Sequence, residues 1–170
     1  RNVKPKAPFT TSKLQQSAAT RLGFTSKKTM QIAQKLYEGV NIGSKRVGLI
    51  TYMRTDSVRI SDSALEDVRS WIGKNFPNDL PEKPVEYAVG KKAQDAHEAI
   101  RPTYTEYTPD YVKEFLSRDE LRLYQLIWEA FVSSQMKGAK CLTTSVDIKA
   151  DEALFRVSST KVTEKGFYNV

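Results

Sequence analysis

The sequence contains one cysteine and one histidine among its 170 residues. The single cysteine, Cys141, excludes an internal disulfide, and it cannot build a cysteine-based metal cluster with one histidine as its only companion. Long apolar runs are absent too: none approaches the ~18 residues that a membrane span requires. The basic start, RNVKPKAPF, lacks the apolar centre of a signal peptide. We therefore expect a soluble protein of a reducing, intracellular compartment.

Positive charge, by contrast, is plentiful. Lys and Arg number 27 against 20 Asp and Glu, which gives a formal net charge of +7. This balance favours polyanions, either nucleic acid or an acidic membrane surface. Hydrophobic residues make up 39% of the chain, enough for a proper core. Because there is no initiator Met and the last residues, KVTEKGFYNV, stop within a strand-like pattern, we expect a piece of a longer protein.

Helical patterns dominate the chain up to about residue 136. Cap residues and apolar stripes predict helices within residues 10–23, 25–39 and 61–76, then one short and one long helix within 108–136. A strand is expected at 47–54, and β-branched residues after Lys140 predict two or more further strands. The predicted fold class is mostly α with short β. The order of elements suggests a helix-turn-helix or winged-helix-like domain, and any small helical domain is the alternative.

Residues 47–57, VGLITYMRTDS, place a phenol and a guanidinium within an apolar run. Side chains alternate between faces in an extended chain, so Tyr52 and Arg54 would lie on the same side. A nucleophile beside a fixed cation suits an anionic substrate. Alternatively, Tyr is an ordinary strand residue, with an apolar ring and a solvated hydroxyl. The residues alone leave both interpretations open.

The only histidine, His97, lies in the charged segment DAHEAIRP, which also contains Arg101. A lone histidine in a polar segment is most often an ordinary surface residue. If this segment lies against the strand with Tyr52, then Arg54, His97 and Arg101 would surround one phenol with three potential cations. Guanidinium groups bind phosphate oxygens in a bidentate fork and offset the charge of a pentacovalent transition state. The arrangement would suit a scissile phosphate.

Three segments resemble, in order and spacing, the central region of bacterial type IA DNA topoisomerases: APFTTSKLQQSAATRLGFTSKKTMQIAQKLYEG, GLITYMRTDS and AHEAIRPT. The resemblance runs from about residue 4 into the C-terminal strands. It implies that Tyr52 is the nucleophile, which attacks one DNA strand and becomes linked to its 5′ phosphate. Arg54 would position and stabilise the phosphate, and His97 would belong to the same catalytic site. Arg101, in the third motif, would bind DNA phosphate.

The resemblance also implies a division of the chain. Residues 1–10 would be an arm from an adjoining β-rich domain, and residues 11–138 would be the nucleophile-bearing, helix-turn-helix-like domain that swings to open a DNA gate. Residues 139–170 would be a piece of the β-rich arch domain. The implied activity is cleavage of one strand, strand passage and religation, which relaxes negative supercoils.

The family's acidic Mg²⁺-binding domain has no counterpart in this sequence, which lacks an Asp-x-Asp pair with an accompanying Glu in a strand–loop setting. We therefore expect no metal ligands here, Mg²⁺ only in the intact enzyme, and an inactive isolated chain. The implied partners are single-stranded DNA and the remaining domains of the enzyme, including that acidic domain, and no membrane partner is expected. The enzyme would act as a monomer in the cytoplasm, on the bacterial nucleoid.

Two other functions stay open. In a non-catalytic DNA-binding helix-turn-helix module, basic helices would contact phosphate and Tyr52 would merely pack; trapping of a covalent DNA adduct separates this module from the enzyme. A tyrosine recombinase would be expected to carry several separated Arg and His residues around a tyrosine near the end of the chain. Tyr52 lies early, which argues against the recombinase.

Overall fold

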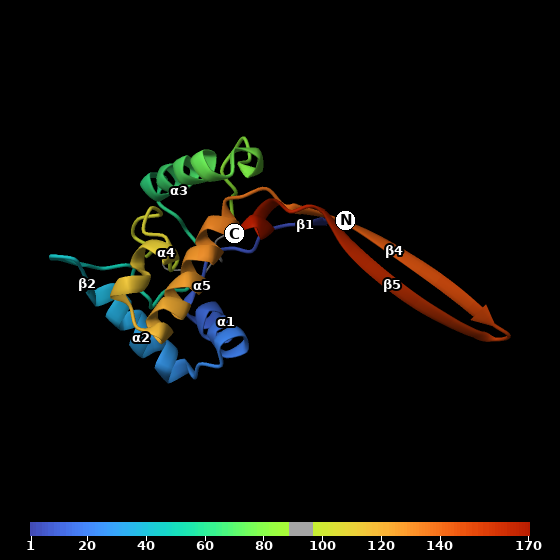
Figure 1. The fold of residues 1–170 in the computed structure, drawn as a ribbon, viewed down its shortest axis with the longest axis horizontal. Helices are drawn as coiled ribbons and strands as arrows, with labels where there is room; N and C mark the ends of the chain where they lie inside the picture. The colour runs from blue at the N-terminus through green and yellow to red at the C-terminus, as the bar shows by residue number, and fades with distance from the viewer. Residues whose placement is uncertain (89–96) are drawn as a thin grey trace.

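The structure, a computed structural model, describes residues 1–88 and 97–170. The described residues form a mixed α/β fold with five α-helices: α1 (Thr11–Leu22), α2 (Ser26–Glu38), α3 (Asp62–Asn75), α4 (Pro109–Val112) and α5 (Arg118–Ser134). Strands β1 (Asn2–Val3), β4 (Ala139–Ala150) and β5 (Ala153–Glu164) make one antiparallel sheet, and β2 (Val40–Ile42) pairs with β3 (Lys45–Val47) in another. Three 3-10 turns, η1 (Pro77–Asp79), η2 (Lys113–Phe115) and η3 (Gly166–Asn169), complete the elements (Figure 1).

The longer helices begin at polar cap residues, as the sequence predicts. Thr10, Thr25, Ser61 and Ser117 each accept a hydrogen bond from the backbone N–H three residues later. Such a bond satisfies one of the donors that a helix start leaves unpaired. Ser117 also belongs to a capping box, because the side chain of Glu120 accepts from its backbone N–H. The predicted helices are confirmed.

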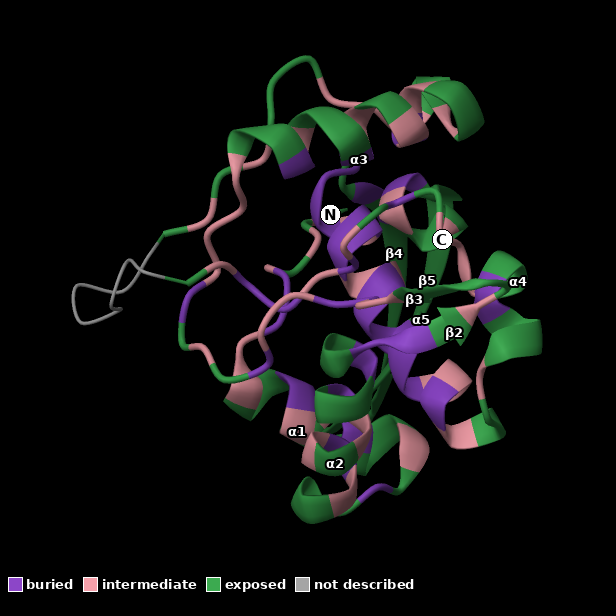
Figure 2. Cartoon of the chain, turned by 90° about the vertical axis from the view of Figure 1, so that its left-hand side faces the viewer, coloured by how far each residue is buried: buried purple, intermediate pink, exposed green. Residues whose placement is uncertain are grey.

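Helix α5 lies at the centre of the core, and most of its surface is buried (Figure 2). Helices α1, α2 and α4 all pack against it. Its fully buried side chains include Leu123, Tyr124, Ile127 and Phe131. Two ion pairs also join α2 to the start of α5, Lys28–Asp119 at 2.6 Å and Lys35–Glu120. Because exposed ion pairs contribute little, burial of the α5 side chains accounts for most of the stabilisation of this packing.

Strands β4 and β5 form a hairpin that extends away from the helices (Figure 1). The two strands confirm the prediction of strands after Lys140, and at 12 residues each they are longer than the short β of the predicted fold class. A two-residue turn, with Asp151 at a φ of 50°, joins the strands and lets them pair from Cys141–Val162 to Ala150–Ala153. The hairpin exposes large apolar side chains: Leu142, Val146, Ile148, Leu154, Phe155, Val157 and Val162. A two-stranded hairpin of this kind is marginally stable in water on its own.

The strand predicted at residues 47–54 is wrong. β3 ends at Val47, and beyond it only Ile50 of this segment forms an isolated bridge, to Pro102. Leu49 and Ile50 are both buried, so the side chains do not alternate between a buried and an exposed face. Its apolar residues are buried although the segment is not a strand. In a sequence, a short apolar run of this kind cannot be distinguished from a buried strand.

Residues 166–170 return from the hairpin to the helical part of the chain. The N–H of Phe167 donates to the carbonyl of Lys137 (2.9 Å), and the amide of Asn169 donates to the carboxylate of Asp79 (2.6 Å). Phe167 also packs against the core. Across residues 1–88 and 97–170, no helix combines the length and apolar character needed to cross a membrane.

Candidate active site around Tyr52

Tyr52 lies in an irregular segment that is fixed by hydrogen bonds to three distant parts of the chain. Leu49 donates its N–H to a carbonyl in the last turn of α2 (2.8 Å), and Thr51 donates its N–H to the carbonyl of Arg101 (2.9 Å). The third attachment joins this segment to the start of α1: the N–H of Thr11 donates to the carbonyl of Thr55 (2.9 Å). The backbone around Tyr52 is therefore held although it is not part of a sheet.

Gly48 lets this segment pass close to the end of α2. A Cβ at this position would lie 2.7 Å from the backbone oxygen of Tyr37, which cannot move without shifting the helix end. We expect Gly48→Ala to destabilise the protein by about 1–3 kcal/mol, as overpacking typically does, and to lower the melting temperature. Gly73→Ala in α3 is the matched control, because its methyl group would meet only Leu80 Cδ2 at 3.5 Å. Equal melting temperatures for Gly48→Ala and the unchanged protein would contradict this account.

Two aromatic rings flank Tyr52. The ring centroid of His97 lies 5.4 Å from that of Tyr52, at an interplanar angle of 35°, and the ring of Tyr37 meets Tyr52 edge-on, also at 5.4 Å. Tyr52 is partly exposed and His97 is exposed. The structure thus brings together the predicted nucleophile and the predicted site histidine from segments far apart in the sequence. Asp95, in the same charged segment as His97, lies outside the described residues.

The two predicted arginines have different surroundings. Arg54 is exposed, and no ion pair joins it to another residue of the described ranges. The side chain of Arg101 is only 12% exposed: its Nη2 lies 2.6 Å from a carboxylate oxygen of Glu98, and its Nη1 donates to the carbonyl of Pro102 (3.0 Å). Arg54 is thus free to meet a phosphate at the surface, whereas Arg101 is bonded within the protein. Phosphate binding by Arg101 stays a prediction.

Comparison with known proteins decides the family. A family model described as DNA topoisomerase matches residues 1–170. The chain belongs to the bacterial type IA DNA topoisomerases. It is 59% identical, over its whole length, to DNA topoisomerase 1 of Treponema pallidum, and 49% identical to that of Campylobacter jejuni. Full-length topoisomerase I from Thermotoga maritima matches all of the chain with a TM-score of 0.84 and 40% identity. The chain spans only about a quarter of these proteins: 23%, 25% and 27%.

Glu98 directly follows His97 in the sequence of this topoisomerase chain. Partial burial acts to raise the pKa of the Glu98 carboxyl, but hydrogen bonds from Ser61 and Arg101, together with the charge of Arg101, outweigh it. The pKa of Glu98 therefore lies below its ordinary value. A carboxyl with a lowered pKa in the folded state stabilises the protein above its unfolded pKa, and this stabilisation disappears as the pH falls through the folded pKa.

Glu98→Gln should therefore destabilise the protein most near neutral pH. We expect the difference in unfolding free energy between the two proteins to shrink as the pH falls below the unfolded pKa of this carboxyl and through its lower folded pKa, where the original carboxyl becomes protonated. Urea denaturation at a series of pH values measures it. Glu106, which is exposed, gives the matched control Glu106→Gln. A difference that stays constant over this range would show that the charge of Glu98 does not contribute.

The residues around Tyr52 do not fit the Mg²⁺ that this family implies. No group of three or more His, Cys, Asp or Glu side chains suited to a metal is present within residues 1–88 and 97–170. Glu98, beside His97, is already bonded to Arg101 and to the N–H of Ser61. Mg²⁺ requires several oxygen ligands in octahedral geometry, so we derive no step through a metal held by these residues.

Sequence reasoning assigned no site role to three neighbours of Tyr52 and His97. Tyr37 approaches from the last turn of α2, and no periodicity indicates which residue of one element will meet an irregular segment. No sequence signal indicates the role of Thr51, because its hydroxyl bonds to the backbone: it donates to the carbonyl of Ala99 (2.7 Å). Glu98 could have been found, since an opposite charge three residues away, at Arg101, is a common spacing for an ion pair.

Proposed function

We propose that this chain is part of a longer type IA topoisomerase in which Tyr52 cleaves one DNA strand. The phenol gives up its proton as its oxygen attacks the scissile phosphorus, the bond from phosphorus to the 3′ oxygen breaks, and the leaving 3′ oxygen takes up a proton. The 5′ phosphate stays on Tyr52 until the 3′ hydroxyl attacks it and religates the strand. Passage of the other strand between these two steps relaxes negative supercoils.

The contact between the rings of Tyr52 and His97 is the observation that carries this proposal. It places the phenol beside a group that can be cationic, with Arg54 two residues further along and open to solvent. In the proposed reaction the Arg54 guanidinium binds the phosphate oxygens and offsets their growing negative charge. His97 assists at the same phosphate. The match to DNA topoisomerases over residues 1–170 supplies the substrate class.

The finer organisation of the chain is also proposed. Helices α1 and α2, which pack together and are followed by the β2–β3 hairpin, form the helix-turn-helix or winged-helix-like part of a domain spanning residues 11–138. Residues 1–10 and 139–170 belong to an adjoining β-rich arch domain. The pairing of β1 with β4 and the exposed apolar side chains of the β4–β5 hairpin support this division.

The remaining partners lie outside this chain. We propose that other domains of the longer protein supply the carboxylates for Mg²⁺ and complete the active site over Tyr52; the relatives, of which the chain spans about a quarter, are long enough to contain such domains. Single-stranded DNA is the substrate. The enzyme acts as a monomer, in the cytoplasm and on the bacterial nucleoid.

A covalent trapping experiment tests the proposed function. The longer protein is mixed with a single-stranded oligonucleotide labelled at its 3′ or its 5′ end and then denatured. A 5′ phosphotyrosine link leaves the 3′ portion of the strand on the protein, so only the 3′ label should migrate with it. Retention of the 5′ label would indicate the opposite polarity. Retention of neither label would favour the non-catalytic DNA-binding module, which the net charge of +7 also fits.

The isolated chain should bind single-stranded DNA weakly and should not relax supercoiled DNA. Its Lys and Arg side chains would neutralise phosphates, so affinity should fall steeply as the salt concentration rises. Fluorescence anisotropy of a labelled oligonucleotide at several salt concentrations measures this slope. An affinity independent of salt would contradict the electrostatic account, and relaxation of plasmid by the chain alone would contradict the need for other domains.

A further inference from the structure

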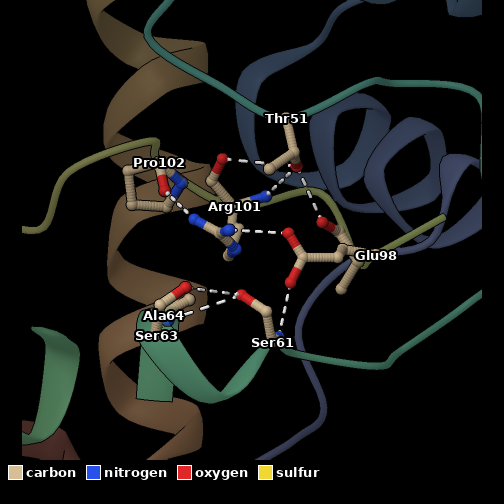
Figure 3. Close-up of polar contacts among 8 residues, drawn as sticks. Thr51, Ser61, Ser63, Ala64, Glu98, Arg101 and Pro102 are labelled. Atoms are coloured by element: carbon tan, nitrogen blue, oxygen red, sulfur yellow. Dashed lines mark hydrogen bonds and ion pairs between the residues drawn. The ribbon is translucent and has the colours of Figure 1, made fainter. Parts of the chain in front are cut away.

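The carboxylate of Glu98 lies between two donors from different parts of the chain (Figure 3). One oxygen accepts from Nη2 of Arg101 at 2.6 Å, and the other accepts from the backbone N–H of Ser61. Ser61 is the N-cap residue of α3, whose side chain accepts from the N–H of Ala64. The Glu98 and Arg101 side chains are only 18% and 12% exposed. Glu98, the residue after His97, is therefore bonded both to Arg101 and to the start of α3.

The same segment is bonded to the residue before Tyr52. Thr51 exchanges backbone and side-chain hydrogen bonds with residues 99–101: its N–H donates to the carbonyl of Arg101 (2.9 Å), and its hydroxyl donates to the carbonyl of Ala99 (2.7 Å). The N–H of Arg101 in turn donates to the Thr51 hydroxyl (3.0 Å). Figure 3 shows these bonds converging beside the Glu98–Arg101 pair. The pair and the Thr51 bonds thus connect the immediate neighbours of Tyr52 and His97.

Both terminal nitrogens of the Arg101 guanidinium donate within the protein, and the side chain is only 12% exposed. Nη2 is bonded to Glu98 and Nη1 to the carbonyl of Pro102 (3.0 Å). Nε is buried and has no hydrogen-bond partner among the residues that the structure describes, so it does not face a phosphate at the surface, and the guanidinium carbon lies 6.0 Å from the ring centroid of Phe131 in α5. Removing one partner of such a pair leaves a buried charge uncompensated, so the two side chains should act as one unit.

We propose that Glu98 and Arg101 are positioning residues that hold the imidazole of His97 against the ring of Tyr52, and that Arg101 does not bind DNA phosphate. The inference rests on the proposed function, because the contact matters for cleavage only if Tyr52 is the nucleophile. It assigns Arg101 a different role from the phosphate binding that its motif implies. Two measurements separate the roles.

The first measurement needs no DNA cleavage. His97 is the only histidine of the chain, so its imidazole protons give one set of NMR signals. We expect nuclear Overhauser contacts between these protons and the Tyr52 ring in the unchanged chain, and loss of at least half their intensity in Glu98→Gln and in Arg101→Gln. Glu106→Gln should leave them unchanged. Full contacts in both variants of the pair would overturn the positioning role, whatever the activity of the enzyme.

The second measurement uses the longer enzyme at saturating single-stranded DNA. Glu98→Gln and Arg101→Gln should each lower the single-turnover cleavage rate at least tenfold, and the double variant should lose much less than the product of the two effects. DNA affinity and its salt dependence should match the unchanged enzyme. Arg101→Lys, which keeps the charge beside Glu98, should retain more activity and serves if Arg101→Gln fails to fold.

Opposite results would overturn the inference. If Arg101→Gln weakens DNA binding and lowers the salt slope by about one, while Glu98→Gln cleaves normally, then Arg101 binds a phosphate. If both variants cleave at the original rate, the position that the pair gives to His97 does not contribute to cleavage. If the unchanged enzyme forms no adduct at all, the proposed function fails, and the NMR contacts still decide whether the pair holds His97.

Discussion

Tyr52→Phe should abolish covalent adduct formation in the longer enzyme and leave its fold and DNA binding almost unchanged. The substitution removes the only atom that attacks phosphorus in the proposed reaction, and the phenyl ring can still pack between Tyr37 and His97. We expect cleavage to fall by at least about 10⁴-fold, as happens when a covalent nucleophile is removed. End-labelled oligonucleotide cleavage measures the rate, and circular dichroism with anisotropy measures fold and binding.

Tyr37→Phe is the matched control for this prediction. It removes the same hydroxyl from a ring that touches Tyr52, so it changes the neighbourhood without removing the nucleophile. Its cleavage rate should stay within a few-fold of the original, on the order of 1 kcal/mol or less. If Tyr37→Phe abolished the adduct and Tyr52→Phe did not, the assignment of the nucleophile would be wrong.

Arg54→Ala should slow cleavage by about 10²-fold, which corresponds to ~3 kcal/mol of lost transition-state stabilisation. The nucleophile remains, but the exposed guanidinium that is proposed to bind the phosphate oxygens is gone. Arg54→Lys should recover only part of the rate, because an ammonium group supplies charge without the planar fork. Single-turnover cleavage at saturating DNA measures both variants.

An exposed arginine away from the site provides the control for Arg54. Arg118, in the first turn of α5, is exposed, and its substitution by Ala should change cleavage little. Equal rates for Arg54→Ala and Arg118→Ala would mean that Arg54 contributes only general charge. A lysine variant as fast as the original would mean that the bidentate geometry is unimportant.

Local signals in the sequence were sufficient for the helices. Thr10, Thr25, Ser61 and Ser117 cap helices because their hydroxyls and backbone satisfy local donors, and local interactions can be read from neighbouring residues. The segment around Tyr52 was wrongly predicted as a strand, because local interactions do not determine its conformation. Its partners lie in α1, α2 and residues 99–103, so the interactions that shape it are distant in the sequence.

The candidate site shows the same limit. The side-by-side placement of Tyr52 and His97 was inferred from motifs, and the structure places their rings in contact. The sequence could not show that the guanidinium of Arg101 turns inward to Glu98 and Phe131, because its burial depends on a distant element, α5, which contains Phe131. Arg54 and Arg101 therefore have different surroundings: Arg54 is exposed, whereas the side chain of Arg101 is mostly buried.

Identification of the residue that carries the DNA tests the account most directly. The longer enzyme is trapped on a single-stranded oligonucleotide and digested with a protease and a nuclease, and the peptide that retains a nucleotide is sequenced by mass spectrometry. The account predicts one modified peptide, which contains GLITYMRTDS with a nucleotide joined through its 5′ phosphate to Tyr52. A nucleotide on any other side chain, or joined through its 3′ phosphate, would contradict it.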